Sequence, residues 1–198
     1  MPVPFPFAAI DFETTGSVAG YPVEPWQVGV VVFRPGEPPD CWESLLRVGE
    51  RPFHPRAPGR HAKLRDQLLD APGLEECLPA FRQRCGGLPL LAHNCATEIN
   101  CLRAALPMER FGPWIDSLKL SRAAWPTLSS HKLEDLLAQF QLTSALEEAL
   151  PGRGAHDALY DAYGSALILE FLLRQPGWED CSLDLLLHPD LQAYYRRA

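Results

Sequence analysis

The sequence predicts an α/β domain in which strands come first and helices make up most of the remainder. The strands are predicted from apolar runs at residues 8–16, 25–33 and 41–48, whose short connections suit an antiparallel meander rather than crossover helices. The helices are predicted from apolar residues at helical spacing further along the chain. With 198 residues, of which 46% are hydrophobic and 22% are charged, the chain is long enough to form one domain with a sizeable core.

The end of the first strand carries two acidic residues. Asp11 and Glu13 are separated by Phe12, and two threonines and a glycine follow them. Because side chains two residues apart in a strand point the same way, both carboxylates are expected on one face. Adjacent carboxylates repel each other, and a divalent cation such as magnesium or manganese would keep both ionised. An isolated Asp-x-Glu is more often a solvated strand end, so a metal site requires further ligands downstream.

The rest of the chain adds two short strands and several helices. Buried strands are predicted at residues 88–94 and 114–116, the second of which runs into a helix through Leu118 and Leu120. Further helices are predicted at residues 61–70, 75–85, 97–106 and 132–140. Glu98 falls in the first turn of the helix at residues 97–106, where an acidic residue often does no more than complement the helix dipole.

A second polar stretch, at residues 154–163, opens a long helix that runs towards Leu173. His156 and Asp161 are five residues apart, which would place them about 140° apart around a continuous helix. Both side chains therefore cannot share one helical face. We expect His156 to lie on the loop before the helix, Asp157 to be the N-cap, and Asp161 to face a site from the second turn.

Charge and composition exclude several classes of protein. A formal net charge of −7 argues against a basic surface that coats duplex nucleic acid, although metal ions would still allow the chain to hold a strand end. No apolar run approaches membrane-spanning length, and residues 1–4 lack the basic region of a secretory signal. We therefore expect no membrane partner and a cytoplasmic location. The six cysteines form no Cys-x-x-Cys pair and are expected to be reduced.

Together these stretches resemble the DEDDh group of 3′-to-5′ exonucleases, which includes ribonuclease T and oligoribonuclease. Residues 10–16 match the first family motif, residues 92–98 align with the second, and His156 and Asp161 have the His-x4-Asp form of the third. The resemblance implies a ribonuclease H-like fold with a mixed five-stranded sheet, an antiparallel meander plus parallel strands, flanked by helices. It also implies an exonuclease domain at residues 1–175, and we expect residues 176–198 to be a short helical extension packed on it.

The resemblance further implies a two-metal active site. The ligands of two magnesium or manganese ions would be four carboxylates, those of Asp11, Glu13, Glu98 and Asp161. His156 would be the general base that takes a proton from the attacking water. Thr14 and Thr15 would contact the terminal sugar, although turn residues of this kind equally often bond to nearby backbone. The expected substrate is the 3′ end of single-stranded DNA or RNA, and the sequence does not identify a protein partner such as a polymerase.

Glu98 departs from the family pattern, which usually has Asp at this position. The longer side chain keeps the charge, but a displacement of about 1 Å can cost on the order of 100-fold in rate. Three alternatives therefore stay open. The first is a catalytically weakened protein that binds nucleic acid or a protein partner, and the second is an enzyme that acts mainly on short RNA. The third is a general phosphodiesterase for small nucleotides.

Overall fold

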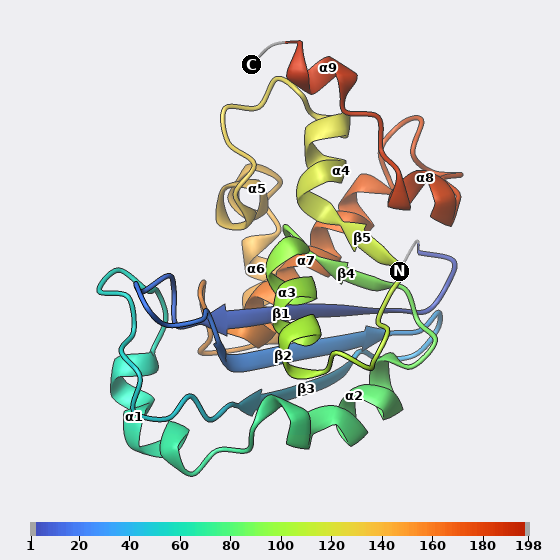
Figure 1. Ribbon diagram of the computed structural model, residues 1–198. Helices are drawn as coiled ribbons and strands as arrows, with labels where there is room; N and C mark the ends of the chain where they lie inside the picture. The colour runs from blue at the N-terminus through green and yellow to red at the C-terminus, as the bar shows by residue number, and fades with distance from the viewer. Residues whose placement is uncertain (1–2, 197–198) are drawn as a thin grey trace.

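A mixed five-stranded sheet forms the centre of the protein, in the order β3-β2-β1-β4-β5 (Figure 1). The computed structural model describes residues 3–196, so residues 1–2 and 197–198, at the outer limits of the predicted domain and extension, lie outside the described residues. The strands are β1 (Phe7–Thr14), β2 (Pro25–Phe33), β3 (Asp40–Leu45), β4 (Leu90–Ala92) and β5 (Trp114–Asp116). The first three strands pair antiparallel, whereas β4 pairs parallel with β1 and with β5. The predicted mixed sheet is confirmed.

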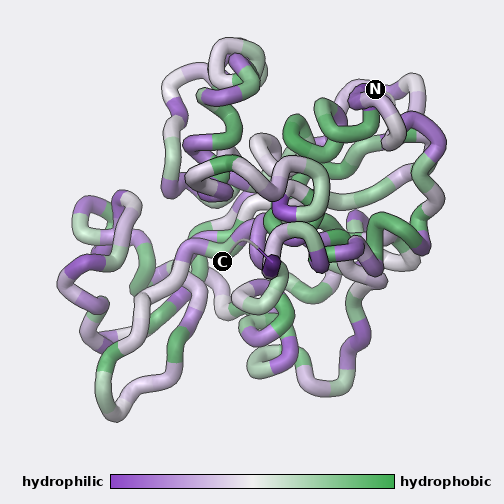
Figure 2. The backbone as a smooth tube through the Cα atoms, turned by 90° about the horizontal axis from the view of Figure 1, so that it is seen from above, coloured by the Kyte–Doolittle hydropathy of each residue, from purple (hydrophilic) through white to green (hydrophobic). Residues whose placement is uncertain are grey.

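Helices cover both faces of this sheet (Figure 1). In chain order they are α1 (His61–Leu69), the 3-10 helix η1 (Leu74–Cys77), α2 (Leu78–Cys85), α3 (Ala96–Ala105), α4 (Ser117–Ala124), α5 (Leu133–Gln139), α6 (Thr143–Ala149), α7 (Ala158–Leu172), α8 (Leu183–Leu187) and α9 (Gln192–Tyr195). Many of the coils in Figure 2 carry both hydrophobic green and hydrophilic purple, as expected for helices that bury one side. No helix in the part of the chain that the structure describes is long and apolar enough to cross a membrane.

Strand β1 separates two hydrophobic cores because its side chains alternate between the two faces of the sheet. Phe7 and Ala9 pack into the core that contains α7, whereas Ile10 and Phe12 pack into the core that contains α2 and α3. The alternation places Asp11 and Glu13 on the α7 side, and it confirms that Phe12 packs on the opposite face.

Helix α7 approaches the sheet closely at its N-terminal end, and a glycine of β2 makes this possible. A Cβ atom on Gly29 would lie 2.3 Å from the backbone nitrogen of Leu159, so no larger residue fits there without movement of the helix. Gly29 is paired with Asp11 across the β1–β2 ladder. The close approach therefore brings the first turn of α7 next to the acidic end of β1.

Three local predictions need correction. The strand predicted at residues 41–48 ends at Leu45, because the chain then turns away and the amide of Arg47 donates to the carbonyl of Pro72. The single helix predicted at residues 75–85 is divided into η1 and α2, with a proline in the first turn of α2. Helix α6 was not predicted, because only one of its seven residues, Leu146, is buried.

The C-terminal segment packs against the rest of the fold. Leu186 of α8 is completely buried in the core on the α7 side, and α8 lies against β5. Helix α9 lies beside α4, as Figure 1 shows at the top of the molecule. The chain between residues 176 and 196 therefore reaches the part of the fold where β4 and β5 end.

Candidate active site

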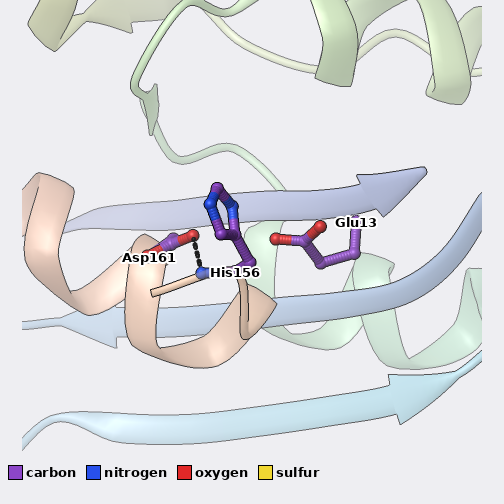
Figure 3. A group of neighbouring side chains, drawn as sticks. All are labelled: Glu13, His156 and Asp161. Atoms are coloured by element: carbon purple, nitrogen blue, oxygen red, sulfur yellow. Dashed lines mark hydrogen bonds between the residues drawn. The ribbon is translucent and has the colours of Figure 1, made fainter. Parts of the chain in front are cut away.

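Three predicted site residues meet where β1 ends and α7 begins (Figure 3). Potential ligand atoms of Glu13, His156 and Asp161 all lie within 4.8 Å of one another. Glu13 comes from β1, directly before a break in the β1–β2 register, and Asp161 comes from the first turn of α7. The close approach of α7 to the sheet thus joins two motifs that are far apart in the sequence.

His156 lies on the loop before α7, which confirms its predicted position. Its φ angle is 64°, in the left-handed region that residues other than glycine seldom adopt. In this conformation its backbone N–H donates to Oδ2 of Asp161 at 3.0 Å, while the imidazole is exposed (Figure 3). The loop therefore holds the imidazole beside the two carboxylates at the cost of a strained backbone.

Asp157 anchors this loop. Its side chain is only 3% exposed and caps α7 by accepting from the amide of Tyr160, as predicted. It also accepts from Nη1 of Arg153 at 2.8 Å and from Nη2 of Arg60 at 2.5 Å. Burial alone would raise the pKa of Asp157, but Arg153 and the Tyr160 amide outweigh it and hold the pKa below its usual value. Asp157 therefore stays ionised next to His156.

Replacing Asp157 with alanine is expected to destabilise the protein by about 2–4 kcal/mol, because the change removes a helix cap and leaves two arginines without their buried partner. For a chain of this size the melting temperature should fall by roughly 5–15 °C in a thermal unfolding experiment. Asp157→Asn is the matched control, since it can still cap the helix and should lose less. Equal losses in the two variants would show that charge alone matters at this position.

The acidic residues of the site are poorly solvated. Burial, and then the neighbouring carboxylates of Glu98 and Asp161, raise the pKa of Asp11 well above its ordinary value. Burial also raises the pKa of Glu13 to about 7, of Asp161 to about 7 and of Glu98 to about 8. Without a positive partner, these groups favour their protonated forms. The site is thus a group of carboxyl groups that need a cation in order to ionise together.

Glu98 differs from the other three acidic residues in its surroundings. It projects from the first turn of α3, is only 2% exposed, and has one oxygen, Oε2, that finds no hydrogen-bond partner among residues 3–196. Its charge nevertheless affects the pKa of Asp11, so the two groups are close. A buried carboxylate oxygen without a partner, among other acidic oxygens, fits a hard divalent cation such as magnesium or manganese.

The raised pKa values predict that the metal-free protein loses stability as the pH rises. A carboxyl group whose pKa is higher in the folded than in the unfolded state contributes its full stability at pH values below the unfolded pKa. This contribution is lost as the pH rises through the folded pKa. This window runs from 4.5 to about 7 for Glu13 and from 4.5 to about 8 for Glu98. With a chelator present, we expect the melting temperature to fall by at least about 5 °C between pH 5 and pH 8.

Glu13→Gln is the variant that isolates this effect, because its amide does not titrate. Its melting temperature should depend less on pH than that of the unmodified protein across the same range. Magnesium or manganese should restore most of the stability lost at pH 8, since a cation that binds only the folded state stabilises it. A metal-free melting temperature that rises towards pH 8 would contradict the proposed electrostatics.

A pocket of about 730 Å³ opens beside these residues. Asp11, Glu13, His156 and Asp161 form its acidic end, whereas Glu98 does not contribute to its lining. Its lining also includes Arg122, Ser130, His131, Lys132, Glu134 and Tyr194. The sequence placed Lys132 only at the start of the helix predicted at residues 132–140. It gave no signal for Arg122 or Tyr194, because neither belongs to a motif.

The hydroxyls of Thr14 and Thr15, which are predicted to contact the terminal sugar, are both hydrogen-bonded within the protein. Thr15 is completely buried and its hydroxyl accepts from the amide of Glu24 at 3.1 Å, while the hydroxyl of Thr14 accepts from the amide of Gly16 at 3.4 Å. Neither threonine lines the pocket. Both hydroxyls therefore stabilise the turn after β1, and a contact with substrate remains a prediction.

His93, at the end of β4, has a structural role in the pocket. Its Nε2 donates to the carbonyl oxygen of His131 at 2.8 Å, and its Nδ1 lies 2.9 Å from the hydroxyl of Ser117. Burial lowers the pKa of His93, which keeps the ring neutral at physiological pH. His93 thus fixes the loop that carries His131.

Comparisons with known proteins agree with this geometry. The model of the RNase T protein family, which is described as an exonuclease family, matches residues 8–169 of this chain. Exodeoxyribonuclease 10 of Escherichia coli K12 is 30% identical over 169 residues, which cover 85% of this chain and 69% of that protein. A PolC-type DNA polymerase III of Bacillus subtilis is 28% identical over 173 residues, covering 85% of this chain but only 11% of that protein.

A solved structure of exonuclease X in complex with 5′ overhanging duplex DNA has the same fold. It superposes with a TM-score of 0.66 and 28% sequence identity, covering 91% of this chain and 97% of that one. The family match spans β1 to most of α7 and includes every acidic residue of the candidate site. The chain therefore belongs to the RNase T exonuclease family, within the DEDDh exonuclease superfamily.

Proposed function

We propose that this enzyme is a metal-dependent 3′-to-5′ exonuclease that releases nucleoside monophosphates from the ends of nucleic acid strands. The observation that supports it most strongly is the convergence of buried and half-buried acidic groups from β1, α3 and α7 beside an exposed imidazole. A pocket of about 730 Å³ opens at the same place and gives access to a strand end. Residues 176–196 would be an extension of this exonuclease domain.

Two magnesium or manganese ions would be held by the carboxylates of Asp11, Glu13, Glu98 and Asp161. When bound, such ions activate water and neutralise the charge that develops on the phosphate and the leaving oxygen. The four carboxyl groups would give up their protons on cation entry, because their raised pKa values reflect the lack of a positive partner. Phe12, packed on the opposite face of β1, would hold Asp11 and Glu13 in register.

His156 would act as the general base. Its imidazole takes a proton from the attacking water, whose oxygen forms a bond to phosphorus while the bond from phosphorus to the 3′ oxygen breaks. The 3′ oxygen of the shortened strand takes a proton from solvent, the imidazolium returns its proton to solvent, and the released nucleotide carries the 5′ phosphate. The hydrogen bond from the His156 amide to Asp161 would keep the base in place relative to a metal ligand.

The proposed substrate is DNA, with a single-stranded 3′ end as the preferred form. The relative named exodeoxyribonuclease 10 and the exonuclease X complex with duplex DNA support DNA as the nucleic acid. Association with a polymerase is a further proposal, supported by the match to part of a PolC-type polymerase. The expected cytoplasmic location stays a prediction.

A second candidate is a catalytically weakened protein that binds nucleic acid without turning it over. It is favoured by one observation, the burial of Glu98 away from the lining of the pocket. The active enzyme is favoured by the grouping of Glu13, His156 and Asp161 within 4.8 Å of one another, with Asp11 close enough to interact electrostatically with both acids. The two candidates differ in whether Glu98 binds a metal ion, so a measurement of metal binding by Glu98 distinguishes them.

The direct experiment is digestion of 5′-labelled strands in magnesium or manganese. Single-stranded DNA, single-stranded RNA and duplex DNA with a 5′ overhang should be compared, with chelator as one control and Asp11→Asn as another. We expect a ladder that shortens from the 3′ end of DNA and disappears in both controls. Faster digestion of RNA would move the substrate assignment to short RNA, and no cleavage of any strand by the folded protein would favour the weakened candidate.

Glu98→Gln tests whether Glu98 is a metal ligand. The amide has nearly the same size but no charge, so it should weaken manganese binding by at least about 10-fold and reduce turnover. Isothermal titration calorimetry measures the first effect and strand digestion the second. Glu75→Gln is a control, since Glu75 is an exposed acidic residue of η1 outside the acidic cluster. Unchanged manganese affinity in Glu98→Gln would remove Glu98 from the ligand set.

A further inference from the structure

The pocket lining beyond Asp11, Glu13, His156 and Asp161 comes in part from three separate parts of the chain. Arg122 comes from α4, His131 and Lys132 directly precede α5, and Tyr194 comes from α9. We refer to these four residues as the Tyr194 subsite. Arg122, His131 and Lys132 lie within residues 8–169, where the family model matches, whereas Tyr194 lies beyond them in the C-terminal segment.

The aromatic ring of Tyr194 is held firmly at this position. The guanidinium carbon of Arg122 lies over it, 5.0 Å from the ring centroid, and the ring of His131 meets it at 82° with centroids 5.5 Å apart. Contacts of both kinds are attractive and orient the ring. Tyr194 is nevertheless only half-buried, so part of its ring remains available to a molecule in the pocket.

His131 carries a hydrogen-bond acceptor that is not used within the protein. Its side chain is 8% exposed, and its Nδ1 lies 3.1 Å from the hydroxyl of Ser121. That hydroxyl donates to the carbonyl oxygen of Leu118 at 2.8 Å, so Nδ1 must carry the proton that it shares with Ser121. Nε2 is then an acceptor, and it finds no partner among the described residues.

Arg122 and Lys132 give the subsite its charge. Nε of Arg122 is buried and has no hydrogen-bond partner within residues 3–196, and Lys132 is exposed at the rim. Two cationic groups beside an aromatic ring match the parts of a nucleotide, because cations bind its phosphate and the ring stacks on its base. Nε2 of His131 is buried as well, so it adds an unpartnered polar atom to the wall of the subsite rather than an exposed contact.

We propose that the Tyr194 subsite binds a nucleotide unit of the strand other than the one whose phosphate lies at the acidic residues. Tyr194 stacks on the base of that unit, and Arg122 and Lys132 bind its phosphate. The proposal rests on the proposed exonuclease function, since the same strand must reach the acidic end of the pocket. The C-terminal segment thereby contributes to substrate binding as well as to the core.

The test compares binding of a strand with hydrolysis of a substrate that has only one phosphate. Binding of a short fluorescein-labelled single-stranded DNA is measured by anisotropy in calcium, and hydrolysis is measured on the p-nitrophenyl ester of thymidine 5′-monophosphate in manganese. Tyr194→Leu should weaken strand binding by about 10-fold. Arg122→Ala should weaken it as well and reduce the slope of log affinity against log salt by about 1. Ester hydrolysis should change much less than strand binding in both variants.

Exposed residues outside the pocket provide matched controls. Tyr21→Leu changes an exposed tyrosine, and Arg110→Ala removes an exposed arginine. Tyr194→Phe keeps the ring and should bind strand nearly as well as the unmodified protein. Unchanged strand binding in Tyr194→Leu, or an equal loss in Tyr21→Leu, would overturn the subsite. Strand binding without any cleavage would instead count against the proposed function while leaving the subsite supported.

Discussion

Asp11→Asn is expected to abolish strand cleavage and, at the same time, to raise the stability of the metal-free protein. Asp11 is central to the acidic group, because its pKa is raised by burial and by four neighbouring carboxylates, those of Glu98, Asp161, Glu13 and Asp157. Removal of its charge takes away a metal ligand and should reduce turnover by at least about 1,000-fold. It also removes repulsion among buried acids, so the melting temperature in chelator at pH 8 should rise by several degrees.

A matched control for this variant is Asp66→Asn, which changes an exposed aspartate of α1. Asp66→Asn should change neither the rate of strand cleavage nor the melting temperature. Loss of activity in Asp11→Asn together with a lower melting temperature would show that Asp11 has a structural role instead. Retained cleavage in a folded Asp11→Asn protein would remove it from the metal site altogether.

His156→Gln is expected to reduce turnover by about 100-fold to 10,000-fold, the usual contribution of a general base. Manganese binding should be largely kept, because four carboxylates remain to hold the ions. Single-turnover digestion measures the first effect and calorimetry the second. His188→Gln is the control, since His188 is exposed and lies after α8, outside the pocket lining.

The two measurements on His156→Gln distinguish two roles for the imidazole. Slow turnover with normal manganese affinity indicates a base. Loss of both turnover and manganese affinity indicates that His156 is itself a ligand, which its position among the potential ligand atoms of Glu13 and Asp161 would also allow. Normal turnover would contradict both roles.

Much of the fold could be predicted because hydrophobic patterning determines it locally. Strand β2 has the predicted bounds of Pro25–Phe33, since all nine of its residues are buried and only Gln27 among them is polar. The division of residues 74–85 into η1 and α2 could not be predicted from the apolar pattern. Leu74 of η1 and Phe81 of α2 are buried in the same core, so the apolar pattern continues across the break. Helix α6 buries only Leu146 and therefore has almost no amphipathic signal.

The candidate site was predictable only where polar residues interrupt apolar runs. Asp11, Glu13 and Asp161 follow such runs, and the helical geometry alone placed His156 on a loop. Arg122 and Tyr194 reach the pocket through the packing of α9 beside α4, which depends on contacts between segments far apart in the sequence. The separation of Glu98 from the pocket lining likewise depends on the exact position of α3, which no local pattern specifies.

The measurement that tests the central claim most directly is manganese titration by calorimetry at pH 6 and pH 9, in buffers of different ionisation enthalpy. The claim is that buried carboxyl groups give up protons to bind the catalytic ions. Because the pKa values of Glu13 and Asp161 are raised to about 7, binding should release protons to the buffer at pH 6 and release far fewer at pH 9. Tight binding with the same small proton release at both pH values, or no binding at either, would contradict the claim.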